Sequence, residues 1–448
     1  MANAWRPELG ALARLAAPVA LVQLGMMTMG TVDVMMLGRV SEQALAAGAL
    51  GNSISFGALV FGMGVLFALD PLIAQAWGAR NHVALARHLQ RGMVLAVAMC
   101  VPMGIFLWDI RWLLELLRQD PSIREPAAAY IRAIIPGMPG FLLFVAARQT
   151  LQAMSRVRQA LWAIFIANVV NAAANYALIF GNWGFPRLEV VGSAWSTTVS
   201  RWAMCIAVLT IAAPSLRPYL TGLRRSVLAP SSYGPLVRLG IPIGLQVSLE
   251  MSMFLSVTLM MGNLGARELA AHQIALVLAA MSFMVPLGIS GAAAARVGNA
   301  IGRGDPVGAR RSAVTALALG VCVMTVSAMA FGLFPSFLAR LFTPEAAVVA
   351  LAATLLPVAA LFQIFDGLQV VSAGILRGAA DTRLPAIIAL IGFWGLGLPL
   401  AYALGIFLGW GPVGLWWGLT LGLASVAVLL VLRLRWVLRG DLAVYEAL

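Results

Sequence analysis

Three carboxylic acids stand inside long apolar stretches of this sequence. Asp33 lies in GTVDVMMLG, Glu250 in QVSLEMSMF and Asp366 in FQIFDGLQVV. A carboxylate in such surroundings is costly, and acids of this kind mark ion pathways, proton relays or contacts to a charged ligand. We expect each of the three to bind a cation or a proton. Pairing with a neighbouring arginine or with freed backbone groups is the structural alternative.

Amide side chains form a regular pattern in a fourth apolar stretch, IANVVNAAANYALIF. Asn168, Asn171 and Asn175 stand at positions i, i+3 and i+7, so they share one face of a helix. Amides in a bilayer either join helices by hydrogen bonds or, beside a carboxylate, offer oxygens to Na⁺ or hold a protonated acid. The spacing leaves both readings open.

Several other polar residues fall within or near apolar stretches. Asp70 precedes Pro71, where an interfacial or capping position is as plausible as a buried one. His272 and Gln273 stand in LAAHQIALV, and a lone histidine there is more commonly hydrogen-bonded within a bundle than a ligand. The sequence does not assign roles to the arginines in such stretches, which either balance an acid or reach the interface: Arg148, Arg201 and Arg296.

Composition decides the solvent in which these residues work. The chain has 448 residues, of which 61% are hydrophobic and 10% charged. A soluble domain carries roughly a quarter charged residues, so the bilayer must solvate this chain. The net charge of +13 comes from arginines in short connections, which is a topological signal and predicts no nucleic-acid partner. No phosphate-loop motif or HExxH pattern is present, and we expect neither an enzyme nor a cofactor.

Twelve apolar runs are long enough to cross a membrane as helices. They predict spans near 12–38, 44–69, 92–112, 127–151, 160–181, 190–213, 236–262, 268–295, 312–335, 346–375, 385–408 and 412–433. Connections on the cytoplasmic side of a membrane carry an excess of basic residues. If both termini are cytoplasmic, the inner connections of this chain hold more arginines than the outer ones, so we predict that orientation.

An internal repeat relates the two halves. When the sequence is aligned with itself so that Pro18 falls on Pro242, Gly78 falls on Gly302 without a gap. The sequence therefore predicts an all-α membrane protein of twelve transmembrane helices, in two six-helix bundles related by a parallel repeat. The expected domains are an N-terminal lobe, residues 1–213, a cytoplasmic linker, residues 214–235, and a C-terminal lobe, residues 236–448. The acids do not repeat, because Asp33 aligns with Val257.

The chain resembles the multidrug and toxic compound extrusion (MATE) family, in its NorM-like bacterial branch. The resemblance rests on PVALVQLGMMTMGTVDVMMLG, AAHQIAL and FQIFDGLQVVSAGILRGAADTRLP, and it covers residues 8–435. It implies two six-helix lobes and export of drugs driven by Na⁺ or H⁺. The acids of the family map onto Asp33, Glu250 and Asp366, and its helix-five polar pair maps onto Asn171 and Asn175. Some archaeal relatives have an aspartate in place of Asn175, so a proton relay in the first lobe is less supported here.

We therefore expect a multidrug efflux antiporter of the bacterial inner membrane, acting as a monomer on cationic or amphipathic compounds by alternating access. Cation coupling is assigned to Asp33, Asn171, Asn175, Glu250 and Asp366, with Na⁺ binding at Asp33 or at the Glu250–Asp366 pair. Asp33, Glu250, Gln273 and Asp366 are candidates for the substrate cavity. Pro18 is a candidate hinge, since proline removes a helical hydrogen bond.

Two other functions are considered. A flippase of lipid-linked oligosaccharides needs basic residues in its cleft, whereas the central charges here are acidic. A membrane-embedded enzyme needs a nucleophile and a base, and the sequence contains no such constellation.

Overall fold

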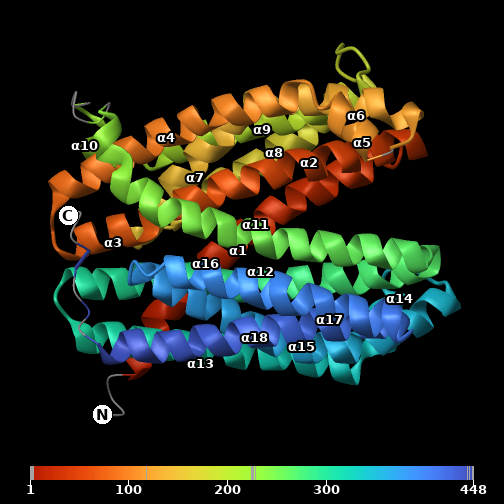
Figure 1. Ribbon diagram of the computed structural model, residues 1–448. Helices are drawn as coiled ribbons and strands as arrows, with labels where there is room; N and C mark the ends of the chain where they lie inside the picture. Colours follow the sequence, from red (N-terminus) through yellow and green to blue (C-terminus); the bar gives the residue numbers. More distant parts are fainter. Residues whose placement is uncertain are drawn as a thin grey trace. The chain divides into compact units, whose positions relative to one another are not determined.

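The protein is described here from a computed structural model. The structure describes residues 5–117, 119–222, 227, 229–440, 442, 444 and 445. Throughout this part of the chain, every regular element is a helix (Figure 1). The predicted all-α membrane fold is confirmed. Residues 223–226 and 228 of the predicted linker lie outside the described residues.

The elements of the first sequence half run in the order α1 (Trp5–Leu37), α2 (Glu42–Leu66), α3 (Leu69–Gly78), α4 (His82–Trp108), α5 (Arg111–Leu116), α6 (Pro121–Ile134), η2 (Ile135–Gly137), α7 (Met138–Ala153), α8 (Arg158–Phe180), α9 (Glu189–Ile211) and α10 (Ala213–Leu220). Those of the second half are η4 (Pro230–Tyr233), α11 (Gly234–Leu264), α12 (Ala266–Gly302), α13 (Pro306–Leu333), α14 (Pro335–Arg340), α15 (Ala346–Gly378), α16 (Arg383–Ala389), η5 (Leu390–Gly397), α17 (Leu398–Tyr402), η6 (Ala403–Phe407) and α18 (Gly411–Arg439).

Each predicted span corresponds to helical structure. By length and composition, eleven helices of the described chain can cross a membrane, and a twelfth is counted if α9 and α10, bent by 88°, form one span. Some spans are composite. The span near 127–151 contains α6, η2 and α7, and the span near 385–408 contains α16 and α17 with two π-helical stretches, η5 and η6.

The internal repeat is visible in the helix boundaries. The stretch 42–78 holds α2 and α3, and the stretch that the repeat aligns with it is α12; α4 and α13 begin at equivalent residues, as do α5 and α14. The first copy is broken at Phe67 and the second is not. Pro71 explains the break, because a proline ring clashes with the carbonyl four residues earlier, which is that of Phe67. The equivalent of Pro71 is Ala295, and α12 continues through it.

The chain divides into two compact units. Unit 1 contains residues 1–20, 70–80 and 241–448, and unit 2 contains residues 21–69 and 81–240. Each unit therefore takes up chain from both sequence halves. α1 passes from one unit to the other shortly after Pro18, and α11 does so directly before Pro242.

In unit 1, α15 packs against α12, α13 and α18, and these helices lie side by side (Figure 1). Small residues allow the approach of α15 to α12: a Cβ on Gly378 would lie 2.6 Å from the carbonyl oxygen of Ala294. Close backbone approach at small residues is how helices associate without water as a driving force.

Within unit 1, α3 crosses the end of α12 in a reciprocal contact. A Cβ on Gly78 would overlap the carbonyl of Asn299, and a Cβ on Gly302 would overlap the carbonyl of Gln75. The internal repeat aligns Gln75 with Asn299 and Gly78 with Gly302. The two contacts are thus the same contact made twice, with the roles of the two copies exchanged.

Polar contacts fasten α3 at this crossing. Asp70 is 1% exposed, and its Oδ2 lies 3.3 Å from Nε of Arg377 on α15. Gln75 donates to the carbonyl of Gly378 at 3.1 Å. Asp70 is therefore a buried partner of an arginine.

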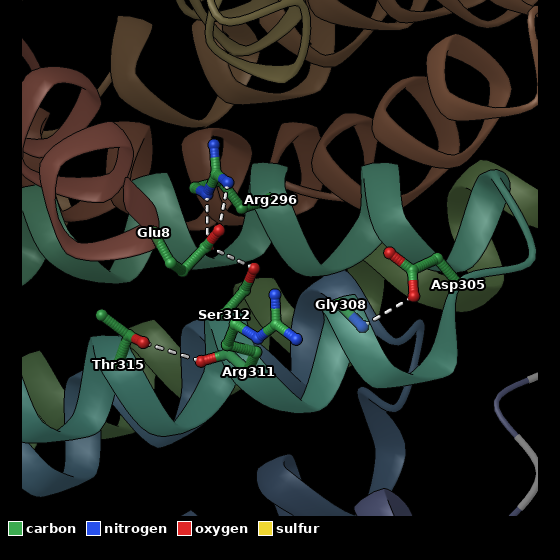
Figure 2. A network of polar contacts seen from close by, with 7 residues as sticks. All are labelled: Glu8, Arg296, Asp305, Gly308, Arg311, Ser312 and Thr315. Atoms are coloured by element: carbon green, nitrogen blue, oxygen red, sulfur yellow. Dashed lines mark hydrogen bonds and ion pairs between the residues drawn. The ribbon is translucent and has the colours of Figure 1, made fainter. Parts of the chain in front are cut away.

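The start of α1 is fastened in unit 1 by a second polar cluster. The Glu8 carboxylate accepts hydrogen bonds from Nε and Nη2 of Arg296 on α12, the first at 2.7 Å. It also accepts a hydrogen bond from the Ser312 hydroxyl at 2.6 Å. Figure 2 shows Glu8 between the two helices that supply these donors. Of the two roles open to Arg296, the structure has it balancing an acid.

Candidate functional site

The first candidate site lies in unit 2, around Asp33 of α1. Asp33 is 8% exposed, and α8 directs two amides at it. Nδ2 of Asn171 donates to Oδ1 at 3.0 Å, and Nδ2 of Asn175 donates to the same oxygen at 2.6 Å. Both asparagines are fully buried. The third member of the amide stripe, Asn168, instead donates to the carbonyl of Gly25 at 3.0 Å and so joins α8 to α1.

The opposite carboxylate oxygen is held from α9. The Thr197 hydroxyl donates to Oδ2 of Asp33 at 2.9 Å. Sequence reasoning misses Thr197, although a signal for it exists. Polar residues recur along α9 at the spacing of one helix face, and all of them are buried: Ser193, Ser196, Thr197, Ser200 and Arg201. A polar stripe that long in an apolar helix marks a face turned toward polar partners.

Two further residues complete the surroundings of Asp33. Tyr130 of α6 is 1% exposed and contacts the Thr197 side chain through its hydroxyl. Arg201 is 6% exposed and lies within electrostatic reach of both Asp33 and Tyr130. Its guanidinium carbon lies 5.4 Å from the centre of the Phe141 ring on α7. The sequence leaves two roles open for Arg201, and the structure places its charge near that of Asp33.

The second candidate site lies in unit 1, where α11 and α15 bring two acids together. Asp366 is 3% exposed, Glu250 is partly buried, and the two carboxylates interact electrostatically. Nε2 of Gln369 donates to Oε2 of Glu250 at 3.3 Å. Among the described residues, no basic side chain forms an ion pair with either acid. Neighbouring carboxylates without a cationic partner repel each other unless a proton or a cation is shared between them.

The remaining polar residues fall outside these two clusters. Arg148 is buried and donates to Oε1 of Gln23 at 2.8 Å. His272 is buried, and its Nε2 lies 3.0 Å from the Thr258 hydroxyl, so it is hydrogen-bonded within its bundle as expected of a lone histidine. Gln273, a candidate for the substrate cavity, is exposed on α12.

The oxygen atoms of the first site suit a hard monovalent cation or a proton. The first site offers a carboxylate, two amides and a hydroxyl, and oxygen ligands of this kind suit Na⁺ rather than a transition metal. Oδ1 of Asn175 is buried without a hydrogen-bond partner among the described residues, which leaves one oxygen free to bind a cation. That part of the chain contains no group of three or more His, Cys, Asp or Glu side chains that could hold a metal ion.

Comparison with known protein families gives one match in two copies. The model of the MatE family matches residues 18–177 and again residues 242–403. The two matches begin at Pro18 and Pro242, which the internal repeat aligns with each other.

Curated relatives match over nearly the whole chain. A multidrug resistance protein NorM of Burkholderia vietnamiensis is 39% identical over 94% of this chain and 92% of its own length. A NorM protein of Mesorhizobium japonicum, described as a probable multidrug resistance protein, is 38% identical over 98% of this chain and 96% of its own length.

Solved structures share the fold. The crystal structure of the eukaryotic MATE transporter AtDTX14 superposes with a TM-score of 0.88, at 24% identity over 96% of each chain. A multidrug resistance MATE family transporter of the MOP superfamily superposes with a TM-score of 0.84, at 19% identity over 96% of each chain.

Proposed function

The chain belongs to the MatE family, and on this basis we propose that it is a secondary active antiporter that exports cationic or amphipathic organic compounds in exchange for Na⁺ or H⁺. The family and its NorM relatives show that the chain is a multidrug efflux transporter and not an enzyme. The coupling ion and the substrate class are the proposed part.

The observation that carries the proposal is the state of the acids. Glu250 and Asp366 lie within electrostatic reach of each other, and no described basic residue pairs with them. Asp33 is held by neutral donors only. Carboxylates in this condition bind a cation or a proton more favourably than they remain charged and empty. A cationic drug and the coupling ion would compete for them, which is the basis of exchange.

The two sites have different roles in this proposal. Asp33, Asn171 and Asn175 bind the coupling cation in unit 2. Glu250 and Asp366 bind either the coupling cation or the charged group of a substrate in unit 1, with Gln273 as a further substrate contact. The protein acts as a monomer in the bacterial inner membrane, with both termini in the cytoplasm and two repeated sequence halves at residues 1–213 and 236–448.

Reconstitution into liposomes tests the proposal. Purified protein is placed in vesicles loaded with a fluorescent organic cation, and an inward Na⁺ gradient is applied at clamped pH or an inward proton gradient without Na⁺. Export that starts with one gradient supports the antiporter and identifies its ion. A second vesicle set carries a fluorescent lipid-linked oligosaccharide analogue. Movement of that analogue, with no drug export under either gradient, would establish the flippase instead.

A further inference from the structure

Arg201 is a buried cation whose position the transport proposal does not use. Its side chain is 6% exposed, and Nη1 has no hydrogen-bond partner among the described residues. Arg148, another buried arginine of unit 2, donates to Gln23. An unsatisfied guanidinium N–H in an apolar interior is unfavourable. The Arg201 side chain is therefore expected to adopt a second position, besides the one over Phe141, in which Nη1 is hydrogen-bonded.

Arg201 lies within electrostatic reach of Asp33. Thr197, which donates to Asp33, stands one turn before Arg201 on the same face of α9. Side chains on a helix lean toward its N-terminus, so the long arginine side chain extends back toward the turn of Thr197. The electrostatic interaction between Arg201 and Asp33 agrees with this direction. In this structure no ion pair joins them, and Asp33 accepts its hydrogen bonds from Thr197 and two asparagines.

The second site has no such cation. In the register that aligns Gly192 with Gly414, the positions of Thr197 and Arg201 in the second half are held by Leu419 and Leu423, which are both buried. At these two equivalent positions the second half therefore carries no charge.

We propose that Arg201 is a tethered counter-cation, which pairs with Asp33 when the coupling cation has left and lies over Phe141 when that cation is bound. Arg201 then competes with the free cation, weakens its binding and assists its release. This inference rests on the proposed function, since it assumes that Asp33 binds the coupling cation. It adds that the affinity of the site is set by an arginine that never touches the ion.

Binding to purified protein tests the inference without transport. The two probes are NaCl at fixed pH and protons titrated in the absence of Na⁺, each followed by intrinsic tryptophan fluorescence. Removing the competing charge in Arg201→Gln is expected to tighten binding of the coupling cation by about tenfold or more. Arg201→Lys keeps the charge and should bind closer to the wild type. The double variant Arg201→Gln with Asp33→Asn should lose the gain.

Two more variants make the outcome decisive. Phe141→Leu removes the ring over which the guanidinium lies and should weaken cation binding, because Arg201 then stays longer with Asp33. Arg148→Gln removes an equally buried charge that is bonded to Gln23, and it should leave the affinity within about twofold. Unchanged affinity for both probes in Arg201→Gln, or in Phe141→Leu if the first variant does not fold, would overturn the inference. Failure of drug export in liposomes with these binding changes intact would instead refute the antiporter.

Discussion

At the scale of single residues, Asp33 is expected to be needed for coupling and not for folding. Its carboxylate accepts hydrogen bonds from Asn171, Asn175 and Thr197, and an asparagine can keep most of them. The amide oxygen of such an asparagine accepts from the two α8 amides, and its NH₂ group faces the Thr197 hydroxyl, which can accept as well as donate. The variant loses the negative charge and the ability to release a proton.

We therefore expect Asp33→Asn to fold and to lose coupled export. Gradient-driven export in liposomes should stop, because the neutral amide can neither balance a coupling cation nor exchange a proton. Thermal melting should stay close to that of the wild type. Asp109→Asn, at an exposed acid after the end of α4, serves as the control. Export by Asp33→Asn at the control's rate would make Asp33 structural.

The Glu8 cluster predicts a graded loss of stability. Glu8→Ala leaves the guanidinium of Arg296 without its carboxylate, and the free energy of unfolding should fall by about 2 kcal/mol. Ser312→Ala removes a single hydrogen bond and should cost about 1 kcal/mol. Melting temperatures in detergent measure both, with Glu42→Ala, an exposed acid in the first turn of α2, as the control. Equal effects of Glu8→Ala and Glu42→Ala would contradict the assigned ion pair.

Sequence reasoning finds the residues whose burial in a membrane costs much free energy, and it misses those whose burial costs little. A carboxylate in apolar sequence, such as Asp33 or Asp366, is visible because nothing but function or pairing explains it. A hydroxyl such as that of Thr197 can bond to its own helix, so its presence in a span excludes nothing. The pairing of Arg296 with Glu8 is equally inaccessible, because the two residues are 288 positions apart.

At the scale of elements, the crossing of α3 and α12 depends on the absence of two side chains. The carbonyl of Gln75 occupies the place that a Cβ on Gly302 would take. Backbone cannot move aside as the end of a flexible side chain does. Helix boundaries of this kind are predictable only in part: the sequence predicts a span near 44–69, whereas α3 extends the first copy to Gly78 after the break at Phe67.

Gly302→Ala should accordingly lower the free energy of unfolding by about 1–3 kcal/mol, as overpacking of a tight interior does. Gly332→Ala is the matched control, because it is also a helical glycine and has open space around its Cβ position. Melting temperatures of the two variants give the comparison. A Gly302→Ala protein as stable as Gly332→Ala would mean that the crossing is not tightly packed.

Pro18 stays the hinge predicted from the sequence. The chain up to Ala20 belongs to unit 1 and the rest of α1 to unit 2, so any relative motion of the units must be taken up in α1 near this point. Restoring the missing backbone hydrogen bond stiffens the helix. Pro18→Ala should slow export several-fold, by about 1 kcal/mol in the rate-limiting step, without lowering expression. An unchanged rate at equal expression would remove the hinge from the mechanism.

At the scale of the whole molecule, the two units are interleaved along the chain. Residues 1–20 and 70–80 belong with residues 241–448, and residues 229–240 belong with the first half. A sequence repeat predicts two similar halves, but it contains no information on which half completes which core. That information comes only from contacts between residues distant in the sequence.

Interleaving predicts that neither half is stable alone. A chain cut between residues 222 and 229 should yield two fragments that co-purify when they are expressed together, because each supplies part of the core of the other's unit. Each fragment expressed alone should aggregate, and size-exclusion chromatography of tagged fragments distinguishes the cases. A monodisperse N-terminal fragment with native helix content would show that the exchanged segments are dispensable.

The reciprocal contact of α3 and α12 has a consequence for ancestry. A contact that pairs equivalent positions is the kind that two identical subunits make across a two-fold axis. Before duplication and fusion, one six-helix chain would have met its own copy here, and each residue had to suit both sides at once. Fusion ended that constraint. Ala74 now faces Gly298 at the centre of the crossing, and Asp33 and Glu250 occupy positions that the other half leaves apolar. One gene product thus acquired two unlike acidic sites, which a symmetric dimer encoded by a single copy cannot have.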